Sequence, residues 1–315
     1  MNSRRLARTW PYPRYSDYER GLRQAAAAWF KSKGFDVQSR YPFILDKFEN
    51  WPKNIICSDV VDYIKAQREA SKGREAYALH KYIHHGLSSQ AMLFNLLGPL
   101  IVRSDLESLK PAFDDAGIIW PQGEIKARFE LTDRTVFNED AGQPTSIDLA
   151  ITGSDVVLFV ESKLSEKEFG GCTLFENGDC EGRNPCRIGL QNCSLHHIGR
   201  QYWNRLQEHG FLEGDMVESP ICPLANYYQF FREVIFALHN KGMFVLLYDE
   251  RNPAFMRQSK QGGTTLGLWP FLQSFIPDSK RDRIGAVTIQ KVVAAISASG
   301  RHNDWIDEFR AKYGM

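Results

Sequence analysis

The chain has 315 residues, of which 43% are hydrophobic and 24% charged, the usual balance of a soluble globular protein. Its net charge of +1 excludes a global basic field, so a nucleic-acid partner would need a local basic groove. No apolar run reaches the ~18 residues that a membrane span requires, and no signal peptide is visible at the start. We therefore expect a cytoplasmic protein that has no membrane partner.

Apolar spacing predicts three helices before residue 100, over residues 18–33, about 58–83, and 90–97. Ser88 and Ser89 offer N-caps to the third helix, which is expected to be interrupted near Pro99.

The pattern changes to strands after Glu124. Alternating or continuous apolar residues, rich in β-branched and aromatic types, predict strands over residues 125–131, 145–152, 156–163 and 243–248. Helices are predicted over residues 195–209 and 227–239, and the C-terminal quarter reads as mostly helical. This order predicts an α/β fold with a mixed central sheet flanked by helices.

Gly153-Ser154 is a two-residue hairpin signal between the second and third strands. With that turn, Asp148 would lie opposite Phe159, and on the same face as Glu161 and Lys163. The diagonal from Asp148 to Glu161 would span roughly 7–8 Å, so the two carboxylates could share one cation.

Residues 156–160 are uninterrupted apolar residues, which is typical of a strand buried on both faces. Charged side chains at the end of such a strand need partners or a metal ion. The alternative to a metal site is an ion pair that stabilises the end of the sheet.

The run Ser146-Ile147-Asp148, followed after twelve residues by Glu161-Ser162-Lys163, resembles the PD-(D/E)XK nuclease superfamily. The resemblance covers roughly residues 88–248, although the proline before the aspartate is missing. It implies a restriction-endonuclease-like core within one domain over residues 1–315, with the core at about 88–250 and a cysteine-containing insert at 168–194.

The resemblance also implies the chemistry. Asp148, Glu161 and the backbone carbonyl of Ser162 would bind Mg²⁺ or Mn²⁺, and Lys163 would orient the attacking water. The reaction would be phosphodiester hydrolysis, with DNA as the expected substrate. A catalytically silent nucleic-acid-binding protein and a zinc-stabilised interaction protein are the alternatives.

Family members often carry a further acid on the helix before the hairpin, and residues 90–102 contain none. Gln90 is our candidate for that catalytic position, and an ordinary exposed glutamine is the alternative. Asp115, Glu124 and Lys126 also fit the Asp…Glu-x-Lys pattern. We reject this second match because no buried strand precedes Glu124.

Four cysteines fall within the insert, and the residues between them are too polar to form a core. Cys172, Cys180, Cys186 and Cys193 are therefore candidate ligands of a structural Zn²⁺ or an iron–sulfur cluster. Their spacing lacks the close pairs common in zinc sites, so free thiols in a loop remain the alternative.

Basic and aromatic residues alternate on the following predicted helix. Arg200, Gln201 and Arg205 are candidate nucleic-acid contacts, because the planar guanidinium suits phosphate. A solvated helix whose aromatic residues pack inward is an equal alternative. A further basic segment precedes residue 15, where four arginines could form an arm that contacts the nucleic-acid backbone.

Overall fold

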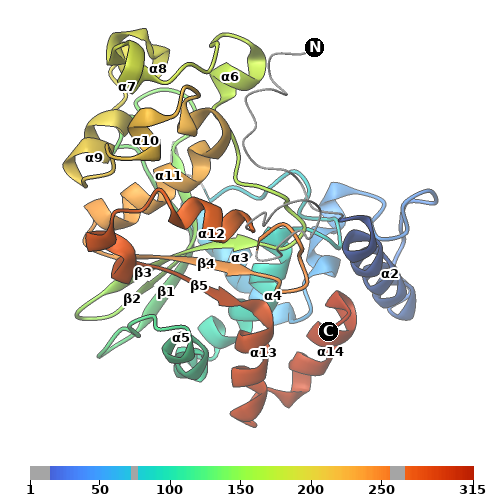
Figure 1. Ribbon diagram of the computed structural model, residues 1–315. Helices are drawn as coiled ribbons and strands as arrows, with labels where there is room; N and C mark the ends of the chain where they lie inside the picture. The colour runs from blue at the N-terminus through green and yellow to red at the C-terminus, as the bar shows by residue number, and fades with distance from the viewer. Residues whose placement is uncertain (1–14, 72–76, 256–266) are drawn as a thin grey trace.

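The computed structural model describes residues 15–71, 77–255 and 267–315, so the arginine-rich N-terminal segment lies outside the described residues (Figure 1). One five-stranded sheet has the order β1-β2-β3-β4-β5. The strands are β1 (Lys126–Asp133), β2 (Thr145–Thr152), β3 (Val157–Lys163), β4 (Met243–Tyr248) and β5 (Ile284–Thr288). The first three are antiparallel, and β3, β4 and β5 are parallel, so the sheet is mixed, as predicted.

Helices cover both faces of the sheet. α4 (Ser89–Val102) and α13 (Ile289–Ala298) pack on one face, and α11 (Pro223–His239) packs on the other (Figure 1). Successive residues of β3 enter opposite clusters: Leu158 and Val160 join the core under α4, and Phe159 joins the core under α11. Burial on both faces explains the continuous apolar run in this strand.

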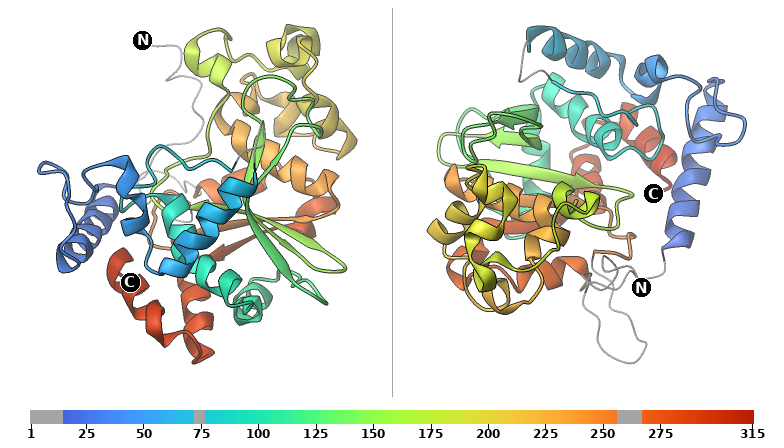
Figure 2. Two further views of the ribbon diagram at one scale, coloured as in Figure 1. Left: turned by 180° about the vertical axis from the view of Figure 1, so that it is seen from behind. Right: turned by 90° about the horizontal axis from the view of Figure 1, so that it is seen from above.

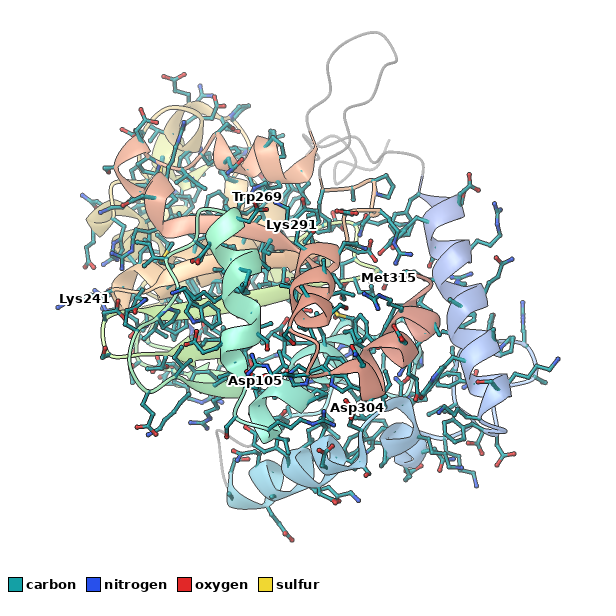
Figure 3. All side chains as sticks on the ribbon, turned by 90° about the horizontal axis from the view of Figure 1, so that it is seen from below. Asp105, Lys241, Trp269, Lys291, Asp304 and Met315 are labelled. Atoms are coloured by element: carbon teal, nitrogen blue, oxygen red, sulfur yellow. The ribbon has the colours of Figure 1, made fainter. Side chains whose placement is uncertain are left out.

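The N-terminal and C-terminal helices pack against each other. α2 (Ser16–Ser32) lies beside α14 (Asn303–Tyr313), as Figure 2 shows from above. Arg103 forms a bidentate pair with Asp304 on α14, at 2.7 and 2.9 Å. Asp105 pairs with His302, and Figure 3 labels both acidic residues on this side of the molecule.

The remaining helices are short, apart from α3. They are η1 (Phe48–Asn54), α3 (Ser58–Ala70), η2 (Leu106–Leu109), α5 (Lys110–Asp115), α6 (Thr173–Asn177), α7 (Pro185–Ile188), η3 (Leu190–Asn192), α8 (Ser194–His197), α9 (Tyr202–Glu208), α10 (Asp215–Glu218), α12 (Leu268–Gln273) and η4 (Asp278–Arg283). Helices α6 to α10 gather over one end of α11 (Figure 1). Within the described part of the chain, no helix is both long and apolar enough to cross a membrane.

The prediction of one helix from 58 to 83 was wrong in its second half, because α3 ends at Ala70. Side chains from other elements hold residues 77–86 in a non-helical conformation. Asn54 donates to the carbonyls of Ile83 and His85, at 2.7 and 2.8 Å. Tertiary hydrogen bonds therefore override the local helical pattern.

The apolar helix is longer than predicted, since α4 continues through Pro99 to Val102. Ser88 is its N-cap and accepts a hydrogen bond from the backbone of Ala91, as expected. Gly98 is required by packing, because a Cβ there would lie 2.5 Å from a methyl carbon of Val60 on α3.

The hairpin register differs from the predicted one by two residues. Thr152 pairs with Val157, not with Asp155, and the turn closes with a bond from Gly153 N–H to the carbonyl of Val156. Gln122 fixes this wider turn by accepting a hydrogen bond from Ser154 N–H at 2.9 Å. A two-residue shift keeps every side chain on its predicted face and sets Asp148 level with Glu161.

Two further predictions needed correction. The helix expected over 195–209 is divided into α8 and α9, because Gly199 adopts a φ of +87° between them. The C-terminal quarter also contains the strand β5. It was not predicted because it has only five residues and mixes apolar residues with glycine and threonine.

Candidate active site

A cleft of about 460 Å³ opens at the edge of the sheet where β1 and β3 end and β2 begins, and residues of α4 and α11 also line it. Besides Gln143 of the loop before β2, its charged and amide side chains come from five elements and the loop after β3. They are Gln90 (α4), Glu130 (β1), Asp148 (β2), Glu161 and Lys163 (β3), Glu166 (loop), and Gln229 and Arg232 (α11). The residues of the predicted motif therefore line one cavity.

The three motif residues are linked by short contacts. Asp148 Oδ2 accepts a hydrogen bond from Ser162 N–H at 2.8 Å. Lys163 Nζ donates to Glu161 Oε1 at 2.6 Å, and both side chains are almost fully buried. The other oxygen of Glu161, Oε2, is buried and has no hydrogen-bond partner among the described residues. A buried carboxylate oxygen of this kind requires a cation or a hydrogen-bond donor as its partner.

Gln229 completes this arrangement and was missed in the sequence. Its Nε2 donates to Glu161 Oε1 at 2.7 Å, and its Oε1 accepts from Lys163 Nζ at 3.0 Å. Gln229 and Glu233 are four residues apart on a helix whose residues are mostly apolar or aromatic. Polar residues at this spacing on a buried helix were the signal that could have identified them.

Gln90 lies at the cleft and orients a carboxylate that sequence reasoning missed. Its Nε2 donates to Glu130 Oε1 at 2.7 Å, while its Oε1 accepts from the backbone N–H of His80. Glu130 has a left-handed φ of 52° and also accepts from Ser146 Oγ at 3.1 Å. A further buried carboxylate therefore lies at the cleft on β1.

Burial and the charge of Glu161 raise the pKa of two neighbouring carboxyl groups. Burial and the charge of Glu161 raise the pKa of Glu130 to about 7, although the bonds from Gln90 and Ser146 oppose this effect. Burial, followed by the charges of Glu161 and Glu130, raises the pKa of Asp148 well above its ordinary value. Burial alone would lower the pKa of Lys163, but Glu161 and the other nearby carboxylates raise it overall. Lys163 therefore stays charged.

The donor set fits a hard divalent cation. Asp148 and Glu161 supply carboxylate oxygens to an open cleft, and a Mg²⁺ ion commonly uses one or two carboxylates with several waters. A cation would also relieve the repulsion that raises the pKa of Asp148. Among the described residues, no group of three or more His, Cys, Asp or Glu side chains is arranged to hold a metal ion.

Two charged residues of α11 extend the site. Glu233 is fully buried, and neither carboxylate oxygen has a hydrogen-bond partner in the described part of the chain. Burial and the charge of Glu161 raise its pKa well above the usual range. Arg232 lines the cleft, and its guanidinium lies 5.1 Å from the ring centroid of Tyr228.

The candidate nucleic-acid contacts, Arg200 and Gln201 just before α9 and Arg205 on α9, do not line this cleft. Arg200 is 9% exposed, and its guanidinium bonds to Asp140 and to the carbonyls of Asn138 and Ala141. The Gln201 side chain donates to the carbonyl of Gly199. Arg205 Nε donates to the carbonyl of Val136 at 3.1 Å, and its Nη1 donates to Glu208 at 2.7 Å. These side chains bind the protein itself, because α9 packs on the 134–142 loop.

The cysteines are brought together in a different combination from the predicted one. Cys172, Cys180 and Cys193 line a small cavity with Cys222, which precedes α11 and was not considered a ligand. Cys186 does not line this cavity. The signal that could have identified Cys222 is its position at the start of a helix that returns to the insert.

The rejected copy of the motif is dispersed, as expected. Asp115 ends α5 and pairs with Lys291, whereas Glu124 and Lys126 pair with each other on the surface at 3.2 Å. Neither Asp115 nor Glu124 lines the cleft.

Comparison with known families agrees with this geometry. A family model described as "Restriction Endonuclease associating with ARP" matches residues 23–314, which include the sheet, the cleft and both helical flanks. No curated protein and no solved structure gives a significant match to the chain. The match supports the restriction-endonuclease-like fold implied by the hairpin motif.

Proposed function

The chain belongs to the family of restriction endonucleases associating with ARP, and we propose that its cleft hydrolyses phosphodiester bonds of DNA with Mg²⁺ or Mn²⁺. Asp148, Glu161 and the backbone carbonyl of Ser162 would hold the cation. The ion would supply an activated water and neutralise charge on the scissile phosphate.

One observation carries this proposal. Glu161 Oε2 is buried beside the cleft and has no partner among the described residues, while its other oxygen is already bonded to Lys163 and Gln229. A purely structural ion pair would use both oxygens, since an orphaned buried acceptor costs about 1–3 kcal/mol. A bound divalent cation satisfies that oxygen and stabilises the ionised form of Asp148.

Lys163 is the cationic group of the reaction. Glu161 and Gln229 hold its Nζ in place, at 2.6 and 3.0 Å, and the ring of Phe169 lies 5.2 Å from it. Such a fixed ammonium group can orient a water and stabilise the negative charge that develops in the transition state. Its buried position strengthens this electrostatic contribution.

Arg232 is our candidate for a phosphate contact. It lines the cleft, and its Nε is buried without a hydrogen-bond partner among the described residues. Its Nη1 lies 4.0 Å from Glu139 Oε1, and a guanidinium that still has an unused donor beside a carboxylate cluster suits a phosphate oxygen. Arg200 lacks this property, because its donors bind the 138–141 segment.

The direct test is incubation of plasmid DNA with the protein plus Mg²⁺, Mn²⁺ or EDTA. We expect cleavage only with a divalent cation, and we expect Asp148→Asn and Lys163→Ala to abolish it while retaining the fold. Lys126→Ala is the matched control, because Lys126 is an exposed residue of the rejected motif and should leave cleavage unchanged.

Cleavage by Asp148→Asn at the wild-type rate would disprove the site assignment. Tight DNA binding without cleavage in either cation would instead identify a catalytically silent binding protein on this fold. Circular dichroism of each variant separates lost chemistry from lost folding.

A further inference from the structure

A second candidate site, separate from the cleft, is a small cavity between the cysteine loop (residues 168–194) and the start of α11. The cavity has a volume of about 30 Å³, and four cysteines line it: Cys172, Cys180, Cys193 and Cys222. They come from segments up to fifty residues apart, so the tertiary structure, rather than a compact sequence motif, brings them together.

Backbone hydrogen bonds fix the segments that carry these cysteines. Cys172 N–H donates to the carbonyl of Ala225 at 3.1 Å, and Cys222 N–H donates to the carbonyl of Gly182 at 2.8 Å. Gly182 N–H in turn donates to Cys180 Sγ at 3.3 Å. Donation to sulfur is a contact that favours a thiolate, the form in which cysteine binds metals.

The other walls of the cavity are mostly apolar, including Phe175, Trp203 and Leu224. Four thiols that only packed against these walls would add little to stability. Four thiolates, in contrast, form the tetrahedral ligand set of a structural zinc ion. The volume is sufficient for about one or two water-sized groups, so it suits a single ion rather than a four-iron cluster.

We propose that Cys172, Cys180, Cys193 and Cys222 bind one structural Zn²⁺, and that Cys186 takes no part. None of these cysteines forms a disulfide. No three metal-binding side chains among the described residues are yet placed around a common point, so the sulfurs must turn inward on binding.

The zinc would join the cysteine loop to the helix that completes the active site. Gly170 N–H donates to Gln229 Oε1 at 3.2 Å, and Gln229 N–H donates to the carbonyl of Gly170 at 2.9 Å. Gln229 lies about two helical turns after Cys222 and bonds to both Lys163 and Glu161. Fixing the loop and the start of α11 at one ion therefore fixes Gln229 from both sides.

The test measures metal content, so its outcome does not depend on nuclease activity. Protein purified under reducing conditions without chelator, with zinc in the growth medium, should contain one zinc per chain by elemental analysis. Cys180→Ser and Cys193→Ser should each lower that content at least several-fold. Both cysteines are partly exposed, so these variants are expected to fold, which circular dichroism will verify.

Cys186→Ser is the matched control and should retain one zinc, because Cys186 lies in the same loop but outside the cavity. Asp148→Asn should also retain it, which separates this ion from any ion in the cleft. Co²⁺ substitution gives a second readout: the thiolate-to-cobalt absorption should persist in Cys186→Ser and disappear in Cys180→Ser.

Three results would overturn the proposal. Wild-type protein that binds neither Zn²⁺ nor Co²⁺ would show that the cysteines are free thiols. Equal loss of metal in Cys186→Ser and Cys180→Ser would show that the ligand set is wrong. Iron with acid-labile sulfide in place of zinc would show that the cavity holds a cluster.

Discussion

At the residue scale, the two oxygens of one carboxylate differ in their surroundings. Glu161 Oε1 has two donors, Lys163 and Gln229, while Oε2 has no partner among the described residues. Gln229 therefore positions both the candidate metal ligand and the cationic group. It acts through their side chains, so its effect should fall on turnover rather than on DNA affinity.

We expect Gln229→Met to lower kcat by roughly 10- to 100-fold and to change KM little. The substitution keeps the length of the side chain but removes hydrogen bonds to two charged groups, worth about 1.5–3 kcal/mol. Single-turnover cleavage kinetics measure this effect. Gln201→Met is the control, because the Gln201 amide bonds to Gly199 outside the cleft. A wild-type kcat in Gln229→Met would remove Gln229 from the site.

Glu130 should make stability fall with pH. An unfolded glutamate loses its proton near pH 4.5, whereas burial holds the pKa of folded Glu130 at about 7. The folded state therefore binds more protons between these values, and the free energy of unfolding decreases as pH rises through that window. In EDTA, we expect Glu130→Gln to remove at most about 3 kcal/mol of this decrease. Urea unfolding of both proteins across this pH range is the measurement, and parallel curves would contradict the assignment.

At the scale of elements, α9 and α11 differ in what their polar side chains contact. The sequence had placed the nucleic-acid contacts on the helix predicted over residues 195–209. α9 packs inward through Tyr202 and Trp203, while Arg205 on α9 and Arg200 just before it bond to the 134–142 loop. α11 instead presents Gln229 and Arg232 to the cleft. The contacts of a whole helix thus decide whether its arginines are available for phosphate.

Arg232→Gln should weaken DNA binding similarly across sequences, and should reduce the slope of log affinity against log salt by roughly 0.9, the value for one lost phosphate contact on duplex DNA. Arg200→Gln should leave that slope unchanged and lower stability by about 1–3 kcal/mol, because it loses internal hydrogen bonds. Salt titrations and urea unfolding of both variants distinguish the two roles. A reduced slope in Arg200→Gln alone would place the DNA on α9.

At the scale of the whole molecule, the terminal helices close one side of the fold. Lys312 on α14 is fully buried, lies 4.2 Å from the ring centroid of Trp29 on α2, and donates to the carbonyl of Asn54. Burial lowers its pKa well below the ordinary value. These contacts join the two ends of the chain and support our proposal that residues 1–315 form one domain.

Lys312→Met should stabilise the protein by about 1–3 kcal/mol at neutral pH, because it removes an amine whose burial costs its hydration or its proton while keeping the volume filled. The carbonyl of Asn54 keeps a donor, since Asn95 Nδ2 also binds it at 3.0 Å. Urea unfolding checks the change. The control is Lys33→Met, which alters a partly exposed lysine paired with Glu308 and should have little effect. A less stable Lys312→Met would indicate that the amine is needed in this contact.

The sequence was sufficient for features that depend on local pattern. The bounds of β2 and β4, the faces of the hairpin and the group Asp148, Glu161 and Lys163 follow from alternation, apolar runs and motif spacing. Gln90 was also placed at the cleft, although it orients an acid and does not replace one. Such features can be predicted because burial of a strand restricts the residue type at every position along it.

Tertiary structure decided what depends on distant contacts. Gln122 set the width of the hairpin turn, and Asn54 kept residues 77–86 out of a helix. The additional acid Glu130, the bridging Gln229 and the cavity residue Cys222 reach their positions only when separate elements pack together. The hydrophobic periodicity of the sequence cannot predict these contacts. They are stabilised by burial and by hydrogen bonds between segments far apart in the chain.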